Sequence, residues 1–443
     1  MPRTPKTNSD TRKHQGPSLL ISGGRVIDPA ARVDATMDVL LRDERIAEIA
    51  PPKKIRGSAN EKLDARGLIV APGFIDLHVH LREPGQSYKE TIATGTAAAA
   101  AGGFTTVCAM PNTSPVNDSA EITSWMLKAE RGAVVNLLPV AAATVGSQGE
   151  RLTDFRALRA AGAVAFTDDG KPILDDALLQ QALWFSTELQ APVIQHAEDT
   201  HMTACGSIHD GPNAFRLGLH GMPVEAEAKV VEHDIQMVQA SGGRYHVAHL
   251  STAEALKSVR RAKRNRLQVS CEVTPHHFTL IDEDVGDYNT NCKMNPPLRS
   301  PADREALLVA LADGTVDAIA TDHAPHATHE KQVEFERAAF GVIGLETAVA
   351  LAVSRLHRER SVPLSRIVDL FSTGPVRVLG LKSRGSLQAG FQADVTIFDP
   401  KRRWIYDVSK SKSLARNSPF DGWQLTGKVV ASIVKGRVVY SAH

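Results

Sequence analysis

Eight short apolar runs, each followed by a longer segment of helical character, constrain the fold of this chain more than any other feature. The runs are rich in β-branched residues, and the spacing between them leaves room for a crossover helix. They cover residues 69–78, 105–110, 134–141, 163–167, 192–196, 245–249, 268–274 and 318–321. Continuous apolar strands are typical of parallel sheets that are buried on both faces. Eight such units predict a closed (β/α)₈ TIM barrel in preference to an open doubly wound sheet.

The two ends of the chain predict a second, smaller unit. Strand-like segments with turns, and without intervening helices, cover residues 19–28, 37–41, 46–49, 393–398, 429–434 and 437–440. We expect these segments to pair with each other in a small β-sandwich beside the barrel. The expected boundaries are 1–17 for a polar, disordered extension, 18–68 and 383–443 for the two parts of the sandwich, and 69–382 for the barrel.

Composition and charge narrow the choice of partner. Lys and Arg number 51 against 50 Asp and Glu, and the formal net charge of +1 gives no broad electrostatic surface for nucleic acid or for an anionic membrane. No run of about 18 apolar residues is present, so no membrane span is expected. The sequence therefore indicates a small-molecule substrate.

The cysteines and the glycine motifs exclude further classes. Cys108, Cys205, Cys271 and Cys292 are scattered without a C-x-x-C pair, which argues against a disulfide framework and against a thiolate zinc site. A reducing cytoplasm fits this usage best. No G-x-G-x-x-G or Walker pattern opens any of the eight units, so a dinucleotide or phosphate site has no support.

The end of the first predicted strand carries two histidines and an arginine. Side chains alternate between the faces of a strand, so His78, His80 and Arg82 are expected to point the same way. A pair of imidazoles beside a guanidinium predicts a metal site next to an anion receptor. Taken alone, an H-x-H motif is as often a solvated strand end as a metal site. The residues at the ends of the other predicted strands are needed to distinguish the two.

Polar residues also follow most of the other predicted strands. The carboxyl ends of the strands form the active site of a TIM barrel, so these side chains are expected to converge. They are Asn112, Asp168, Asp169, His196, His249, His276, His277, Asp322 and His326. A single histidine in an apolar strand is more often part of the core, but placement at one strand end after another favours a metal centre.

The types of ligand predict the chemistry of this centre. Imidazole and carboxylate without thiolate suit Zn²⁺ in a hydrolytic site, and a bridging carboxylate allows two ions to share a hydroxide that acts as the nucleophile. We expect one or two zinc ions per subunit, with two favoured. The aspartate after the eighth strand, Asp322, can act as general base and then as general acid towards a leaving nitrogen.

Five motifs resemble those of the dihydroorotases in the amidohydrolase superfamily. They are Pro72-Gly-Phe-Ile-Asp-Leu-His-Val-His-Leu-Arg-Glu-Pro-Gly85, Met110-Pro-Asn-Thr113, Thr167-Asp-Asp-Gly170, Asn295-Pro-Pro-Leu-Arg299 and Thr321-Asp-His-Ala-Pro-His326. The resemblance extends from about residue 19 to about residue 440. It implies that His78, His80 and Asp322 hold a first zinc and that His196 and His249 hold a second.

The resemblance also implies the class of the enzyme and its bridging ligand. Hydantoinases, allantoinases and the other class of dihydroorotases use a carboxylated lysine as the bridge, whereas the fourth strand here ends in Asp168 and Asp169. Asp169 is the better match to the bridging aspartate of class I dihydroorotases, with Asp168 as the alternative. Lys171 is expected to be a solvated loop residue.

The expected substrate carries a carboxylate on its ring. A desolvated carboxylate requires a fixed cation or several N–H donors, and Arg82 offers a planar fork. Asn112, Asn295 and His326 match the remaining family positions that contact the substrate. The resemblance therefore implies reversible interconversion of N-carbamoyl-L-aspartate and (S)-dihydroorotate in de novo pyrimidine (UMP) biosynthesis.

Two other functions stay open at this point. One is a non-catalytic, dihydroorotase-like scaffold subunit of aspartate transcarbamoylase, and the other is a different cyclic-amide hydrolase such as an allantoinase or a dihydropyrimidinase. The first is disfavoured because no ligand position is lost, and the second because of Arg82 and the missing lysine. The resemblance also implies a homo-oligomer and allows a complex with aspartate transcarbamoylase.

Overall fold

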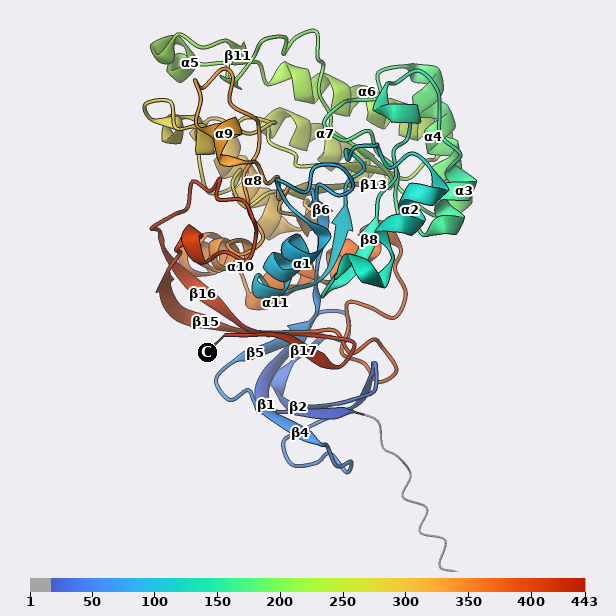
Figure 1. Cartoon of the computed structure of the whole chain (residues 1–443), viewed down its shortest axis with the longest axis vertical. Helices are drawn as coiled ribbons and strands as arrows, with labels where there is room; N and C mark the ends of the chain where they lie inside the picture. The colour runs from blue at the N-terminus through green and yellow to red at the C-terminus, as the bar shows by residue number, and fades with distance from the viewer. Residues whose placement is uncertain (1–16, 443) are drawn as a thin grey trace, which may run out of the picture.

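A β/α barrel stands on a curled β-sheet in the computed structural model, which describes residues 17–442 (Figure 1). The extension expected over residues 1–17 lies outside the described residues except for its last position. In the described part, the α-helices are α1 (Ile92–Ala101), α2 (Ala120–Met126), α3 (Phe155–Ala161), α4 (Asp176–Leu189), α5 (Pro212–Leu217), α6 (Glu225–Ser241), α7 (Ala253–Arg264), α8 (Pro301–Asp313), α9 (Thr328–Lys331), α10 (Ala348–Ala352), α11 (Leu364–Phe371) and α12 (Thr373–Leu379). No helix within residues 17–442 combines the length and the apolar character that crossing a membrane requires.

The barrel strands are parallel to one another, as predicted. They are β6 (Phe74–Val79), β7 (Phe104–Ala109), β8 (Asn136–Pro139), β9 (Val193–Gln195), β12 (Tyr245–Val247), β13 (Val269–Val273) and β14 (Ala318–Ile319). The predicted strand at 163–167 appears only as single bridges from Phe166 to Ala141 and to Val193, and these join the two halves of the barrel. A bridge from Val79 to His323 closes the ring.

The terminal segments form one hydrogen-bonded sheet below the barrel. Its strands are β1 (Ser18–Asp28), β2 (Val33–Arg42), β3 (Arg45–Ala50), β4 (Glu61–Asp64), β5 (Ile69–Pro72), β15 (Val395–Ile405), β16 (Gln424–Val434) and β17 (Arg437–Ser441). Buried side chains from β1 and β2 pack in the same core as side chains from β15 and β16. The sheet therefore folds over a core of its own, in agreement with the sandwich expected from both chain ends.

One expected strand divides between the two units. The sequence predicts a single strand over 69–78, but β5 pairs with β1 and β15 in the terminal sheet, and only β6 belongs to the barrel. The break falls at Gly73, where an added Cβ would lie 2.1 Å from Oγ1 of Thr105. The close approach of the Thr105 and Asp394 side chains to this backbone requires glycine there, and an apolar run gives no sign of it.

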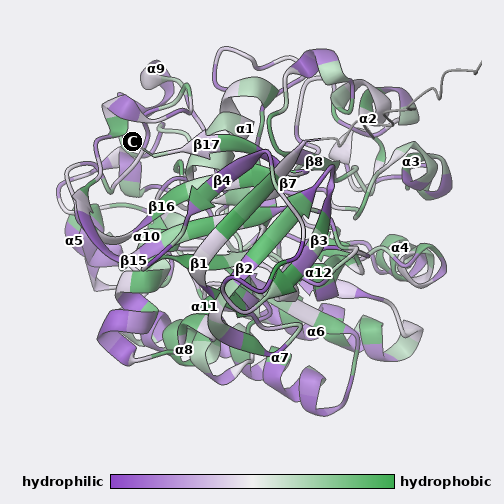
Figure 2. Cartoon of the chain, turned by 90° about the horizontal axis from the view of Figure 1, so that it is seen from below, coloured by the Kyte–Doolittle hydropathy of each residue, from purple (hydrophilic) through white to green (hydrophobic). Residues whose placement is uncertain are grey.

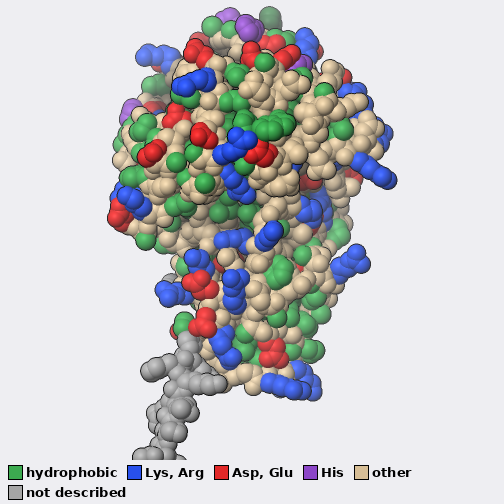
Figure 3. Space-filling model, turned by 90° about the vertical axis from the view of Figure 1, so that its right-hand side faces the viewer, with side chains coloured by type: hydrophobic (Ala, Val, Ile, Leu, Met, Phe, Trp, Pro, Cys, Tyr) green, Lys and Arg blue, Asp and Glu red, His purple; other side chains and the backbone are tan. Residues whose placement is uncertain are grey.

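The helices surround the barrel strands and turn their apolar faces inward (Figure 2). In α7, Leu256 and Val259 are buried, whereas the basic residues of the last turn are favourable at the negative end of the helix dipole. The Ala-rich segment forms α1, whose small side chains permit close packing on β7. Acidic and basic side chains are intermixed on the face drawn in Figure 3, in line with the net charge of +1.

Candidate active site

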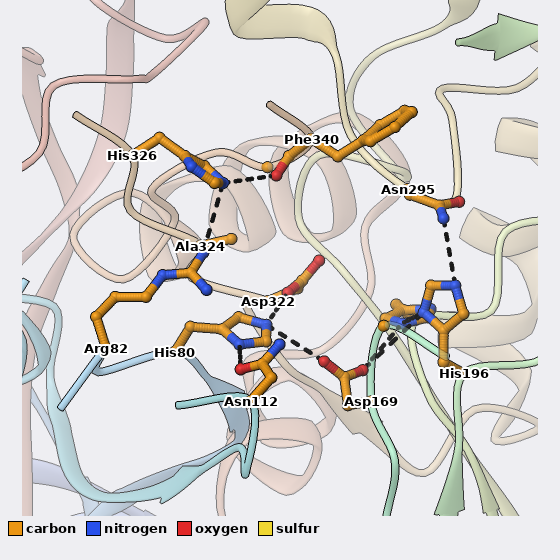
Figure 4. A pocket seen from close by; sticks show the side chains of 13 residues that line it. His80, Arg82, Asn112, Asp169, His196, Asn295, Asp322, Ala324, His326 and Phe340 are labelled. Atoms are coloured by element: carbon orange, nitrogen blue, oxygen red, sulfur yellow. Dashed lines mark hydrogen bonds and ion pairs between the residues drawn. The ribbon is translucent and has the colours of Figure 1, made fainter. Parts of the chain in front are cut away.

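A cavity of about 220 Å³ lies where the carboxyl ends of the barrel strands meet (Figure 4). Its lining includes nine of the ten residues singled out from the sequence, namely His80, Arg82, Asn112, Asp169, His196, His249, Asn295, Asp322 and His326. The tenth, His78, is fully buried beside them. The side chains that the sequence placed on separate strands therefore share one site.

The first cluster of donor atoms combines two imidazoles and two carboxylates. Nε2 of His80 lies 3.0 Å from Oδ1 of Asp322, and Nε2 of His78 lies 3.6 Å from the same oxygen. Asp169 approaches both rings, with Oδ1 at 3.3 Å from His78 and Oδ2 at 3.5 Å from His80. Ligand atoms of His78, His80 and Asp322 lie within 4.8 Å of one another, which is close enough to hold one metal ion.

A second cluster adjoins the first and shares Asp169 with it. Nδ1 of His196 and Nε2 of His249 face each other at 2.9 Å. Oδ1 of Asp169 lies 3.7 Å from the His249 nitrogen and 4.0 Å from the His196 nitrogen. Asp168, the alternative bridge, turns away and accepts hydrogen bonds from the backbone N–H and the hydroxyl of Thr144. Of the two aspartates, only Asp169 contacts both clusters.

The electrostatics of the site call for a cation. Burial alone would raise the pKa of Asp169, but the charges of His78 and His80 and the close polar contacts with His249 and His78 together hold that pKa well below its ordinary value. In Asp322, too, burial is overcome by His78 and by the hydrogen bond with His80, so its pKa is lowered. Burial alone would lower the pKa of His78, yet the charges of Asp169 and Asp322 and the close polar contacts with Asp169 and Glu272 together raise it well above its ordinary value. Two ionised, buried carboxylates need positive charge between them.

The donor atoms fit a metal in a second respect. Nε2 of His78 and Oδ1 of Asp169 are buried and face each other at 3.3 Å, but neither makes a well-oriented hydrogen bond within residues 17–442. Leaving such atoms unpaired is unfavourable unless a ligand satisfies them. Imidazole nitrogen and carboxylate oxygen without thiolate form the donor set of hydrolytic zinc sites. The residues present therefore fit the expected metal centre.

Two glutamates to which the sequence analysis gave no role, Glu198 at the end of the fifth predicted strand and Glu272 within the seventh, orient the candidate ligands. Glu272 lies within β13, with Oε1 at 3.1 Å from Nδ1 of His78 and Oε2 at 3.1 Å from Nε2 of His246. Glu198 lies 2.7 Å from Nε2 of His196. Carboxylates behind imidazoles fix the ring and its tautomer. A charged residue inside an otherwise apolar strand was the available signal for Glu272.

The opposite wall of the cavity carries the arginine. Nε of Arg82 donates to the backbone oxygen of Pro325 at 3.1 Å, and its Nη2 lies 3.4 Å from Nε2 of His326. His326 in turn contacts the backbone oxygen of Phe340 at 2.8 Å. Arg82 is 8% exposed and makes no ion pair within residues 17–442. A buried guanidinium without a carboxylate partner is suited to an anionic ligand.

The two asparagines lie between the metal ligands and the open cavity. Oδ1 of Asn112 lies 2.8 Å from Nδ1 of His80. Nδ2 of Asn295 donates to Glu198 at 2.8 Å and lies 3.3 Å from His196. Both side chains therefore contact the metal-ligand network as well as lining the pocket.

The remaining polar residues of the strand ends lie outside both clusters. Nε2 of His277 donates to the backbone oxygen of Pro296 at 2.9 Å, and His323 lies 3.4 Å from Glu90. His276 is buried nearby. Lys171 is exposed, as expected. None of these four residues contacts the ligand atoms of the two clusters.

Comparison with known proteins agrees with this geometry. The family model described as "Dihydro-orotase-like" matches residues 67–255. A dihydroorotase of Solibacter usitatus (strain Ellin6076) is 49% identical over 424 residues, which are 96% of this chain and 98% of that protein. A dihydroorotase of Anaeromyxobacter dehalogenans (strain 2CP-1) is 49% identical over 425 residues, and these cover 95% and 98% of the two chains.

Solved structures of lower identity show the same fold. An L-hydantoinase (dihydropyrimidinase) from Arthrobacter aurescens has a TM-score of 0.85 at 23% identity and covers 96% of each chain. A D-hydantoinase (dihydropyrimidinase) from a Thermus species has a TM-score of 0.82 at 24% identity, covering 96% of this chain and 95% of that one. These likenesses establish the TIM barrel with its β-sandwich, whereas the relatives of higher identity establish the family. The chain belongs to the dihydroorotase family and is a hydrolase that acts on cyclic amide bonds.

Proposed function

We propose that this chain is a zinc-dependent dihydroorotase that interconverts N-carbamoyl-L-aspartate and (S)-dihydroorotate in de novo pyrimidine biosynthesis. The observation that carries the proposal is the position of Arg82, an unpaired and buried guanidinium that faces two His/Asp clusters across one small cavity. A ring that bears a carboxylate can place its charge on Arg82 and its amide bond over the clusters.

Six side chains are proposed to hold the metal. The first ion would be held by His78, His80 and Asp322, the second by His196 and His249, and both by Asp169. Zinc bound there supplies a nucleophile from water near neutral pH and polarises the amide carbonyl. This assignment is supported by Nε2 of His78 and Oδ1 of Asp169, which are buried 3.3 Å apart without a well-oriented hydrogen bond.

Asp322 is proposed to move the proton. Its neighbours hold its pKa below the ordinary value, so the carboxylate is ionised at neutral pH and able to accept a proton. In ring opening, the oxygen of water bonds to the amide carbon while a carboxylate oxygen of Asp322 takes the water proton. The C–N bond then breaks, and Asp322 returns that proton to the leaving nitrogen. Ring closure follows the same path in reverse.

The other pocket residues are proposed to bind and orient the substrate. Arg82 supplies two parallel N–H donors to the ring carboxylate, and His326 stands beside it at 3.4 Å. Asn112 and Asn295 present amide groups next to the metal ligands, where the polar atoms of the ring would lie.

The test is to measure zinc content and dihydroorotate ring opening on the same purified sample, without any added partner. We expect bound zinc and turnover, with far weaker turnover of dihydrouracil, which lacks the ring carboxylate. If the protein binds zinc but opens an uncharged cyclic amide faster than dihydroorotate, the chain is a dihydropyrimidinase or an allantoinase instead. Turnover only after addition of aspartate transcarbamoylase would make the chain a dependent subunit, and absence of zinc and turnover would favour a scaffold.

A further inference from the structure

A segment from the terminal sheet reaches the wall of the active site. Residues 411–418, between β15 and β16, run along the barrel, and in Figure 1 this red connection lies beside α10 and below α9. The hydroxyl of Ser411 donates to Glu346 at 2.6 Å, and the backbone N–H of Leu414 donates to the buried Glu90 at 3.1 Å. We call residues 411–418 the strap. The half-buried Glu346 and the buried Glu90, both in the barrel, therefore hold the strap in place.

Asn417, in the strap, uses every polar group of its side chain on the loop after β14. Its Oδ1 accepts a hydrogen bond from the backbone N–H of His326 at 3.1 Å. Its Nδ2 donates to the backbone oxygens of Ala324 at 3.0 Å and Gly341 at 3.1 Å. The backbone oxygen of Asn417 also accepts from Ile343 N–H at 3.0 Å. Asn417 is 4% exposed, so water does not substitute for these contacts.

The backbone held by Asn417 is the backbone that supports Arg82. Ala324, His326 and Gly341 line the cavity. Pro325 lies between two of them, and its carbonyl oxygen accepts the Arg82 Nε–H at 3.1 Å. A shift of the 324–326 backbone would therefore move both the guanidinium and the His326 ring.

We infer that Asn417 is a positioning residue for substrate recognition, through which the terminal sheet fixes the carboxylate-binding wall of the site. The inference rests on the proposed function and deepens it. A primary amide is the side chain that this position requires, because it accepts one hydrogen bond while donating two. Aspartate has the same size but cannot donate to the two carbonyls, and alanine can neither donate nor accept.

The test compares Asn417→Ala and Asn417→Asp with a matched control, Asn136→Ala. Asn136 also joins the barrel to the terminal sheet, with Nδ2 donating to Thr105 O at 2.8 Å and to Asp394 at 2.9 Å, but it lies at the start of β8, at the opposite end of the barrel. Both kinds of variant lose hydrogen bonds between the same two units. Only the Asn417 variants lose hydrogen bonds to the backbone of Ala324, His326 and Gly341, which lines the cavity.

We expect KM for dihydroorotate to rise about tenfold or more in both Asn417 variants, because displacement of a binding group by about 1 Å has effects of that order. The value of kcat should stay within about threefold and zinc content should be unchanged, since the other five proposed ligands lie on other strands and Asn417 contacts only backbone beyond Asp322, from Ala324 onward. Amide hydrogen exchange over residues 323–343 should be faster in the Asn417 variants and unchanged in Asn136→Ala. Should the alanine variant fail to fold, the aspartate variant of equal volume carries the test.

Three results would overturn the inference. They are a KM within twofold of the wild type in the folded Asn417 variants, an equal rise of KM in Asn136→Ala, and a loss of zinc that accompanies the rise. Failure of the proposed function is visible separately, because the wild-type protein itself would then not open dihydroorotate.

Discussion

Replacement of Arg82 by methionine tests the substrate assignment directly. Methionine keeps much of the apolar volume but removes the guanidinium, which is 8% exposed and has no carboxylate partner within residues 17–442. Hydrogen bonds to charged groups contribute about 1.5–3 kcal/mol each, and truncation of one member of a buried charge pair costs about 2–5 kcal/mol. A loss of about 3 kcal/mol corresponds to a rise of roughly 100-fold in KM for dihydroorotate, since 1.4 kcal/mol is about tenfold.

The assay is steady-state ring opening of dihydroorotate, with zinc content measured on each sample. Arg82→Lys keeps the charge but loses the planar fork, so it should lie between the wild type and Arg82→Met. Arg244→Met is the matched control, because Arg244 likewise donates to backbone oxygens, of Gln190 at 2.7 Å and Val378 at 2.8 Å, but lies before β12 at the far end of the barrel. An unchanged KM in Arg82→Met, or an equal rise in Arg244→Met, would refute the carboxylate assignment.

Two further predictions concern Glu272 and Lys331, which do not line the cavity. Glu272→Gln weakens the hydrogen bonds to His78 and His246, so zinc affinity measured against a competing chelator should fall by about 10–100-fold, and an unchanged affinity would contradict a role in orienting His78. Burial lowers the pKa of Lys331 to about 7 from the ordinary 10.5. Between these values the unfolded chain binds a proton that the folded chain lacks, so this side chain makes the free energy of unfolding rise with pH, by about 2 kcal/mol from pH 7 to pH 9. In urea unfolding measured at pH 7 and pH 9, the Lys331→Met variant should not show this rise in the free energy of unfolding. If the free energy of unfolding depends on pH in the same way in both proteins, Lys331 does not have the lowered pKa.

The barrel and the convergence of polar side chains at its strand ends could be predicted because both depend on short-range pattern. Strand runs with crossover lengths specify parallel pairing, and parallel pairing brings every strand end to one edge. His196 and His249 are 53 positions apart in the chain, yet each ends a strand, and their ring nitrogens lie 2.9 Å apart. The preference for Asp169 over Asp168 rested on the family resemblance alone, and the direction in which each side chain points, with only Asp169 facing both clusters, needed coordinates.

Features that depend on distant contacts could not be predicted. The division of the 69–78 run at Gly73 reflects the approach of Thr105 and of Asp394, whose backbone oxygen accepts the Gly73 N–H at 2.9 Å. Asn417 lies 91 residues after His326, in a segment without periodicity. Neither position carries a local signal, since the partner that gives each its role belongs to another part of the fold.

Three residues of the candidate site have a backbone conformation that disfavours a side chain. Arg82, His249 and Asp322 have φ angles of 61°, 30° and 45°, in the left-handed region where glycine is the favourable residue. Each such conformation costs a side-chain-bearing residue about 1–3 kcal/mol. Strand β6 ends at Val79, so Arg82 reaches the cavity through this turn and not through the strand alternation used to predict it. Backbone energy favours glycine at all three positions, and the arginine, histidine and aspartate found there are those that the proposed substrate and metals require.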